Sequence, residues 1–491
     1  MAGIGFSLRK LFGRKGMFSL AKAYGYAGLI CAGPMLLGVC LLLGVSVLAS
    51  KGGLSDHDKE LLNCMITYSL LASLTVTSVL NMLVTRFVSD MLYEGKTKRI
   101  MPSFYGSISV MLVGGGILYG LFLLFSGVDP IYKVLCFLFF AILVVVWTQM
   151  NYLTALKEYK GILAGFAVSL AIAFLLALAL VWLEKASIVT LFLCVIIGYG
   201  ILMTWYFKLL LDFFPEEEGI TLNFLRWADR YKSLIGAGFF VHVGLFAHLV
   251  IMYFGPLRVQ VEGLFYGAPQ YDVPALAAYF SLLITTVNFV TSVEVNFYPK
   301  YRNYYGLFND KGSILDIEQA EKEMLSVARK ELTFGAYKQL IATILFVVFG
   351  SGILQALPLG FNDTSIGIYR LLCVGYGLYA VANTLMLILL YFADNKGALM
   401  ASGVFATVSV AATIVSILFW DIPFFGIGFG IGSVCFYLAS WIRLEWYTKK
   451  LPYFLLSKQA VLPDERRKVF GRLCDWLEKR AASREQKKDT K

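Results

Sequence analysis

The chain has 491 residues, of which 58% are hydrophobic and only 15% are charged. Its 43 Lys and Arg residues outnumber its 32 Asp and Glu residues, which gives a formal net charge of +11 at pH 7. This composition excludes an ordinary soluble protein and is typical of an integral membrane protein. The excess positive charge is better explained by loops that face anionic lipid headgroups than by binding to nucleic acid.

About twelve stretches of roughly 20 predominantly apolar residues follow one another along the chain. A bilayer core about 30 Å thick needs about 20 helical residues to cross it, and backbone groups in lipid have to be hydrogen-bonded within the span. We therefore predict transmembrane helices. Their predicted bounds are 24–49, 62–88, 104–126, 131–154, 161–183, 187–211, 232–254, 273–298, 334–355, 366–392, 398–419 and 424–447.

The segments between these spans carry Lys and Arg mainly on one side of the predicted membrane. When residues 1–23 are placed in the cytoplasm, the basic residues left on the outer side are Lys51, Lys59, Lys133, Lys185, Arg258 and Arg370. Positive charge concentrates on the cytoplasmic side of membrane proteins. We therefore expect a multi-pass protein of the bacterial cytoplasmic (inner) membrane with both termini in the cytoplasm.

A polar cytoplasmic linker at 212–231 separates six predicted spans from six more. The sequence thus predicts an all-α integral membrane protein with two six-helix bundles, at 24–211 and 232–450. The other predicted parts are an amphipathic N-terminal helix at 1–23, a cytoplasmic helical segment at 299–333 and a basic amphipathic tail at 451–491.

Three amphipathic segments are predicted on the cytoplasmic side, at 1–22, 313–333 and 464–481. In each, apolar residues fall on one helical face beside charged residues, which is the pattern of a helix in the headgroup plane. We interpret all three as membrane-surface helices, with docking of a partner protein as the alternative. The residues expected to make such contacts are Arg9, Lys10, Arg466, Arg467, Lys468, Leu473, Trp476 and Leu477.

The residues that usually carry catalysis or bind metals are scarce. The eight cysteines lie singly, and the three histidines belong to no His-Glu-x-x-His motif. The sequence therefore predicts no catalytic set, no metal site and no cofactor. His242 and His248 are expected to be hydrogen-bonded core residues. Alternating glycines at 426–432 favour close helix packing over nucleotide binding.

Polar residues inside the predicted spans are candidates for a substrate pathway, because burying them in lipid is costly. Glu294 is the leading candidate, together with Asn288 and Asn296 on the same span. The alternative for Glu294 is an interfacial carboxylate that pairs with Lys300 or Arg302. The full candidate set is Asn81, Arg86, Asn288, Glu294, Asn296, Arg370 and Asn383.

Two simpler interpretations apply to members of this set. Arg86 lies four residues before Asp90 on the second span, a spacing that favours a local ion pair over a substrate contact. The intramembrane amides are also suited to joining helices by hydrogen bonds, an alternative that applies to Asn81, Asn288, Asn296 and Asn383.

Several short motifs together carry a family resemblance. The most specific are the opening Met-Ala-Gly-Ile-Gly-Phe-Ser-Leu-Arg-Lys-Leu, Ala23-Tyr-Gly-Tyr-Ala-Gly-Leu-Ile and Gly33-Pro34. Others are Thr85-Arg86-Phe87 with Asp90, Tyr93-Glu94-Gly95, Ala155-Leu156-Lys157-Glu158-Tyr159-Lys160 and Asn296-Phe297-Tyr298-Pro299-Lys300-Tyr301. Over nearly its whole length the chain resembles PelG, the integral membrane component of Pel-type exopolysaccharide export, within the multidrug and oligosaccharide-lipid exporters.

The resemblance implies a V-shaped pair of six-helix bundles around a central polar cavity. It implies a transporter, not an enzyme, that moves a growing polymer rich in N-acetylgalactosamine across the membrane. The implied partners are a PelF-like cytoplasmic glycosyltransferase and small membrane proteins of the PelD and PelE type. The alternatives are an ion-coupled antiporter for small molecules or lipid-linked oligosaccharides, and a membrane scaffold that only recruits the synthase.

Overall fold

The computed structural model describes residues 28, 38, 43–156, 158–309, 312–356, 361–458, 469–477 and 479; at positions 290, 291, 294, 356 and 458 it describes the backbone only. Eleven helices in this part of the chain are long and apolar enough to cross a membrane. The predicted multi-span helical fold is therefore confirmed. The first predicted span, 24–49, lies mostly outside the described residues, and its last part is helical from residue 43.

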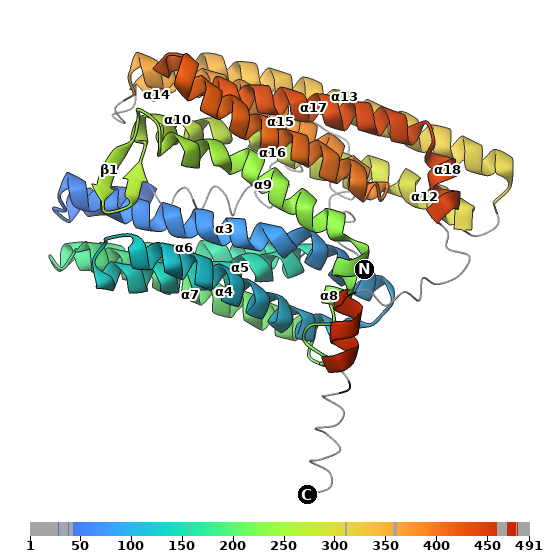
Figure 1. Cartoon of the computed structure of the whole chain (residues 1–491), viewed down its shortest axis with the longest axis horizontal. Coiled ribbons are helices and arrows are strands. Elements are labelled where there is room, and N and C mark those ends of the chain that lie inside the picture. The colour runs from blue at the N-terminus through green and yellow to red at the C-terminus, as the bar shows by residue number, and fades with distance from the viewer. Residues whose placement is uncertain are drawn as a thin grey trace, which may run out of the picture. The chain divides into compact units, whose positions relative to one another are not determined.

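The chain forms two compact units (Figure 1). Among the described residues, the N-terminal unit comprises 38, 43–156, 158–243, 259–267, 457–458, 469–477 and 479. The C-terminal unit comprises 28, Gly244–Arg258 and the described part of Ala268–Leu456. The division between them falls inside helix α9 (Lys232–Met252).

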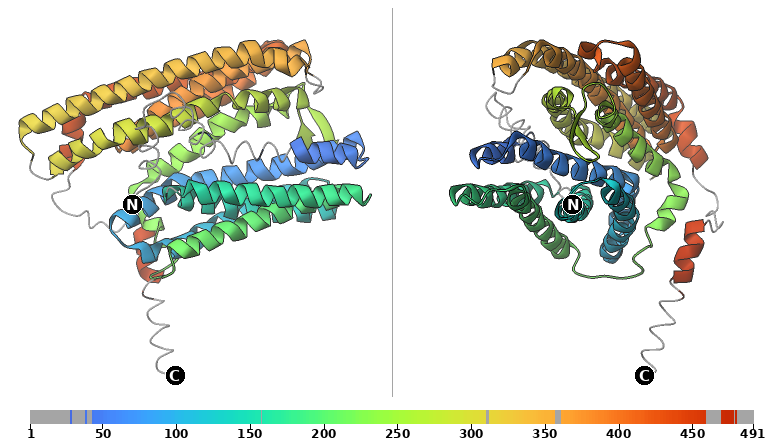
Figure 2. Two further views of the ribbon diagram at one scale, coloured as in Figure 1. Left: turned by 180° about the vertical axis from the view of Figure 1, so that it is seen from behind. Right: turned by 60° about the vertical axis from the view of Figure 1, so that its left-hand side comes forward.

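The N-terminal unit contains helices of mainly apolar sequence that lie side by side (Figures 1 and 2). Polar residues fix their ends: the Ser55 side chain accepts a hydrogen bond from the Asp58 backbone, and Ser187 and Thr190 form a capping box. The elements are α3 (Asp56–Tyr93), η1 (Thr97–Arg99), α4 (Ile100–Phe125), α5 (Pro130–Ala155), α6 (Tyr159–Trp182), α7 (Ile188–Phe213) and α8 (Leu225–Arg230).

A short β-hairpin also belongs to the N-terminal unit, in a segment between two predicted spans. Strands β1 (Val259–Glu262) and β2 (Phe265–Gly267) pair in antiparallel fashion. The Tyr68 hydroxyl donates to the carbonyl of Tyr266 at 2.9 Å, and the Leu264 amide donates to the carbonyl of Ser126 at 2.7 Å. These contacts hold the hairpin against α3 and the C-terminal end of α4.

The C-terminal unit is built around long helices, of which α13 runs along the whole unit (Figure 2). Its elements are α10 (Pro269–Tyr279), α11 (Leu282–Ser292), the π-helical turn η2 (Val293–Phe297), α12 (Tyr298–Asn309), α13 (Ile314–Leu345), the π-helical turn η3 (Phe346–Gly350), α14 (Ser351–Ala356), α15 (Asp363–Tyr391), α16 (Asn395–Phe419), η4 (Ile422–Phe424), α17 (Ile427–Thr448) and α18 (Leu451–Lys458).

The eighth predicted span is not one continuous helix, which corrects the predicted bounds 273–298. The helix is interrupted between α10 and α11, takes the wider π-helical form in η2, and continues as α12 to Asn309. The carbonyl of Ser281 at the break accepts a hydrogen bond from Gln339 Nε2 at 3.2 Å. A side chain of a neighbouring helix thus satisfies a backbone group that the break leaves without a helical partner.

The amphipathic segment 313–333 is also not a surface helix, which corrects that interpretation. It is the first part of α13, which continues without interruption into the ninth predicted span. Its apolar residues Ala320, Met324 and Ala328 are buried in a cluster with Tyr304 of α12. The apolar face of this segment therefore packs inside the C-terminal unit.

Candidate functional site

Polar side chains join α11 and η2 to α13 in the C-terminal unit. Lys338 Nζ donates to Asn288 Oδ1 at 2.6 Å, and Asn296 Nδ2 donates to Glu331 Oε1 at 2.8 Å. Lys338 and Glu331 lie seven residues apart, so they share one face of α13. We call these four residues the polar ladder.

The π-helical turn explains why both amides of the polar ladder reach the same helix. Eight residues of a regular α-helix turn about 80° beyond two full turns, which would point Asn288 and Asn296 in different directions. Each residue in a π-turn rotates the chain by less, because the hydrogen bond spans five residues. The five-residue turn η2 therefore returns Asn296 to the face that carries Asn288.

A second polar group extends the ladder at the Asn288 end. Thr285 Oγ1 donates to Gln339 Oε1, and Gln339 Nε2 donates to Thr343 Oγ1 at 3.2 Å. Thr285 and Gln339 are buried. Because these groups are uncharged and hydrogen-bonded to one another, they hold α11 against α13 without burying a charge.

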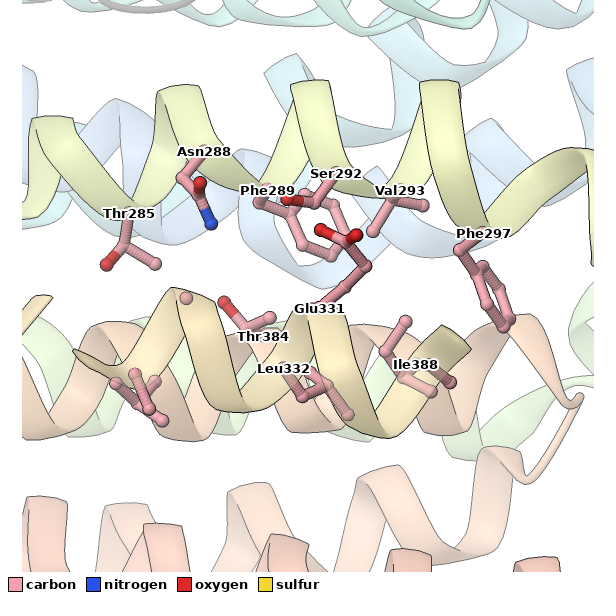
Figure 3. A pocket seen from close by; sticks show the side chains of 14 residues that line it. Thr285, Asn288, Phe289, Ser292, Val293, Phe297, Glu331, Leu332, Thr384 and Ile388 are labelled. Carbon is pink, nitrogen blue, oxygen red and sulfur yellow. The ribbon is translucent and has the colours of Figure 1, made fainter. Parts of the chain in front are cut away.

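A narrow pocket lies beside the ladder, between α11, α13 and α15 (Figure 3). Its polar lining consists of Thr285, Asn288, Ser292, Glu331 and Thr384, and the remaining lining is mostly apolar. Gly335 helps to form this space, because a Cβ atom at position 335 would lie 3.1 Å from Asn288 Nδ2. A larger residue at position 335 would push Asn288 away from its observed position.

The polar groups of this pocket are suited to hydrogen bonding with hydroxyl groups. Amides and hydroxyls that both donate and accept hydrogen bonds match the hydroxyl groups of a sugar. Among the residues that the structure describes, no group of three or more His, Cys, Asp or Glu side chains is arranged to hold a metal ion. The six cysteines in this part of the chain are free thiols.

The remaining candidates of the C-terminal unit are dispersed. The backbone of Glu294 lies within η2, and its side chain is outside the described set. Its suggested partner Lys300 donates to Glu323 at 2.7 Å. Arg370 donates to Ser351 Oγ at 3.4 Å, and it lies about 20 Å along α15 from Thr384 of the pocket. Asn383 is half-buried on α15.

The candidates of the N-terminal unit lie on α3, where Asn81 and Arg86 are exposed. Arg86 forms the expected ion pair with Asp90, at 3.0 Å. Trp227 Nε1 also donates to Asp90 at 2.8 Å, and the Arg86 guanidinium lies 5.4 Å from the ring centre of Tyr231. Arg86 is thus held in a local network within this unit.

The structure adds Lys338, Glu331 and Gln339, which sequence reasoning missed. They lie near the boundary between the charged segment 313–333 and the predicted apolar span 334–355. The sequence predicts two separate elements here, whereas all three residues belong to one helix, α13. The seven-residue spacing of Glu331 and Lys338 was the available signal, since it places both on one helical face.

The two histidines are hydrogen-bonded, as the sequence predicted. His248 is buried, and its two ring nitrogens contact the hydroxyls of Tyr271 at 2.7 Å and Tyr376 at 3.3 Å. In the N-terminal unit, His242 Nε2 contacts Thr75 Oγ1 at 3.0 Å.

The C-terminal tail helix, residues 469–477, is anchored within the N-terminal unit. Arg226 Nη2 donates to Asp475 Oδ1 at 2.9 Å, and the Gly471 amide donates to Asp229 Oδ2 at 2.8 Å. Of the residues expected to make surface contacts, Leu473 and Trp476 are exposed and Leu477 is half-buried. Arg9, Lys10, Arg466, Arg467 and Lys468 lie outside the described residues.

Comparison with solved structures identifies the fold as that of the MATE transporters. A mutant of the Vibrio cholerae MATE transporter VcmN superposes with a TM-score of 0.60 at 13% identity, covering 93% of this chain and 98% of that one. A MATE protein in the bent conformation gives 0.56 at 10% identity, covering 89% and 97%. A MOP superfamily transporter from Pyrococcus furiosus gives 0.52 at 10% identity, covering 87% and 96%. At these identities the similarity shows the fold alone.

The protein is thus a multi-pass membrane protein with a transporter fold. The PelG family model, which describes exopolysaccharide exporters (EPS-E), matches residues 1–455. The chain therefore belongs to the PelG exopolysaccharide exporter family. A comparison with curated proteins found no match.

Proposed function

We propose that this protein carries a growing exopolysaccharide of the Pel type, rich in N-acetylgalactosamine, across the bacterial cytoplasmic membrane. The observation that carries the proposal is the family match over residues 1–455, which spans both compact units. The fold similarity to MATE transporters supports a transport role. In this proposal both termini lie in the cytoplasm.

The polar ladder and its pocket form part of the sugar pathway in this proposal. Asn288 is buried, yet it lines the pocket through an amide that both donates and accepts hydrogen bonds. Glu331 and Lys338 add one charge of each sign on the same helix face, which leaves the ladder close to neutral. Such a surface binds a polyhydroxylated chain weakly at many points, and weak binding allows the chain to move.

Elongation of the polymer supplies the driving force in this proposal. A PelF-like cytoplasmic glycosyltransferase adds sugars at the cytoplasmic side, and the growing chain is pushed through the transporter. Small membrane proteins of the PelD and PelE type complete the assembly. The tail helix is the proposed dock for the glycosyltransferase, because Val469, Leu473 and Trp476 are 66%, 41% and 53% exposed along it.

Gene deletion tests the transport role against the scaffold role. In the native host, deletion should abolish extracellular polymer. A detergent extract of the deletion strain should still elongate polymer from the UDP-sugar donor, because the exporter is not needed once the membrane is dissolved. Loss of elongation in the extract would instead favour a scaffold that activates the synthase. A change in drug resistance with normal polymer secretion would favour an antiporter.

Substitution of Asn288 tests the pathway itself. Asn288→Ala should lower polymer secretion several-fold while the amount of protein in the membrane is unchanged. Thr286→Ala is the matched control, because Thr286 lies on the same helix but is exposed and, among the described residues, bonds only to the Leu282 carbonyl. Equal secretion by the two variants would remove Asn288 from the pathway.

Co-purification tests the proposed dock. Changing Leu473 and Trp476 together to Asp should release the glycosyltransferase from the purified transporter, because the apolar contact surface is lost. Leu456→Asp is the control, since Leu456 is 60% exposed but lies on α18. Full recovery of the glycosyltransferase with the double variant would show that the tail helix is not the dock.

A further inference from the structure

We infer that the exposed face of α12 is a carbohydrate-binding surface, formed by Tyr298, Arg302 and Asn303. We call these three residues the α12 platform. The inference rests on the proposed function. It adds a specific sugar contact at the start of α12, the helix that follows the polar residues of η2 in sequence. In the predicted topology this end lies on the cytoplasmic side, where the polymer is made.

The aromatic ring of Tyr298 is both exposed and supported from behind. Its side chain is 40% exposed, and its ring stacks on that of Tyr301 with centroids 6.4 Å apart and planes at 20°. Tyr301 is fixed in turn, because its hydroxyl donates to the carbonyl of Tyr391 at 3.1 Å and its ring packs 4.3 Å from that of Tyr305. A ring that is held in this way and is partly exposed suits packing on the apolar face of a sugar ring.

The two polar members of the platform have no polar partner among the side chains that the structure describes. Arg302 and Asn303 are exposed, and neither forms a hydrogen bond or ion pair with any other residue that the structure describes. Lys300, on the same helix, is by contrast engaged with Glu323. The Arg302 guanidinium has donors in a fixed fork, and the Asn303 amide both donates and accepts, so together they suit neighbouring sugar hydroxyls.

The shape of the surface leaves room for a ligand. A Cβ atom at Gly306, one turn beyond Arg302, would have no atom within 4 Å. Asn296 precedes the platform and donates to Glu331, which also lines the pocket. The platform follows Asn296 along the chain, from η2 into α12.

The composition of this face favours a sugar over a lipid. Between Ile284 and Ile314, Tyr298 is the one large apolar side chain that is exposed among the described residues. Helix α13 shows the contrasting pattern of a lipid-facing surface, with Phe334 and Ile341 more than half exposed. A surface with one aromatic ring among polar groups is hydrated, and an acyl chain would find no apolar strip to lie on.

Binding to defined sugars tests the platform. The full-length protein in lipid nanodiscs would be titrated with fluorescent hexasaccharides of glucose, N-acetylglucosamine and N-acetylgalactosamine. Tyr298→Ala should raise the Kd for the best-bound sugar about tenfold, and Tyr298→Phe should change it less than about twofold, because the ring face is kept. Arg302→Ala should raise the Kd about fivefold.

Controls separate the platform from general effects of substitution. Tyr337→Ala removes a tyrosine that is 60% exposed on α13, and Arg329→Ala removes an exposed arginine of the same helix. Both should bind the hexasaccharides like the wild-type protein. Equal loss of binding in these controls, or wild-type binding by Tyr298→Ala and Arg302→Ala, would overturn the platform.

Secretion by the same variants separates this inference from the proposed function. If polymer secretion depends on the chain but the wild-type protein binds none of the hexasaccharides, the platform is wrong and the transport role stands. If secretion does not depend on the chain at all, the transport role fails. Tighter binding of anionic lipid vesicles by the wild-type protein than by Tyr298→Ala, without sugar binding, would assign this face to lipid instead.

Discussion

At the residue scale, a buried ion pair secures one end of the C-terminal unit. Asp394 is 4% exposed, and Arg443 donates to its two carboxylate oxygens at 2.6 and 3.0 Å. Asp394 also accepts a hydrogen bond from the Gly397 amide at the start of α16. The Arg443 guanidinium lies 4.5 Å from the ring centre of Trp446. One carboxylate therefore joins the start of α16 to α17.

Removal of this carboxylate should destabilise the protein strongly. We expect Asp394→Ala to lower the free energy of unfolding by about 3 kcal/mol, because Arg443 loses its partner in a mostly buried position and α16 loses its cap. Thermal unfolding in detergent measures this effect. Glu445→Gln is the control: Glu445 is half-buried, and it lies 3.6 Å from Arg329 and from Lys449, which are both largely exposed, so the loss should be about 0–1 kcal/mol. Similar melting temperatures for the two variants would contradict this account.

Sequence reasoning found some of these residues and missed others for a physical reason. Asn288 and Asn296 stand out because amides are costly in an apolar span. Asp394 and Arg443 lie 49 positions apart, and only the fold brings them together. The polar ladder likewise needs the π-turn η2, whose sequence Val-Glu-Val-Asn-Phe carries no pattern that distinguishes it from an α-helix.

At the element scale, two glycines of α17 allow close packing on α16. A Cβ atom at Gly428 would lie 2.5 Å from the Cα of Thr413, and one at Gly432 would lie 2.7 Å from the Cα of Ser409. These glycines are four residues apart and so lie on one helix face. The predicted role of glycines in helix packing is confirmed at these two positions, while Gly430 faces open space.

The effect of substituting these glycines on stability should therefore depend on the helix face that each glycine occupies. Gly428→Val should lower the free energy of unfolding by about 1–3 kcal/mol or more, because the backbone of α16 has to move. Gly430→Val adds the same side chain to the same helix without a steric contact, and it should leave the melting temperature nearly unchanged. A comparable loss in both variants would show that helix propensity and not interhelical packing sets the effect.

The helices themselves were largely predictable, whereas their interruptions were not. The predicted bounds 131–154 and 398–419 agree closely with those of α5 and α16. About 20 apolar residues bounded by polar ones have one stable arrangement in a membrane, which is a spanning helix. The interruption of the helix after α10 could not be predicted from the hydropathy of the sequence. The hairpin of β1 and β2 was missed because its strands are four and three residues long.

At the scale of the whole molecule, the distribution of charge predicts the topology. We expect a Cys placed at Lys51 on a Cys-free background to react with a membrane-impermeant maleimide in intact spheroplasts. A Cys at Lys322 of α13 should react only after permeabilisation. Both positions are exposed, and Lys51 avoids the positive φ of 76° at neighbouring Gly53, which a Cys would strain. Labelling of the Cys at position 322 in intact spheroplasts would show that the orientation is opposite to the predicted one.

The whole-molecule function depends on the path of the polymer, which photo-crosslinking in secreting cells tests most directly. Leu332 lines the pocket, and Ile341 of the same helix is 59% exposed and faces away from it. Each would be replaced in turn by p-benzoylphenylalanine and irradiated while polymer is being secreted. The account predicts that the protein becomes linked to polysaccharide from position 332 and not from position 341. Secretion that continues without crosslinks at 332, or with equal crosslinks at both positions, would contradict a path along the polar ladder.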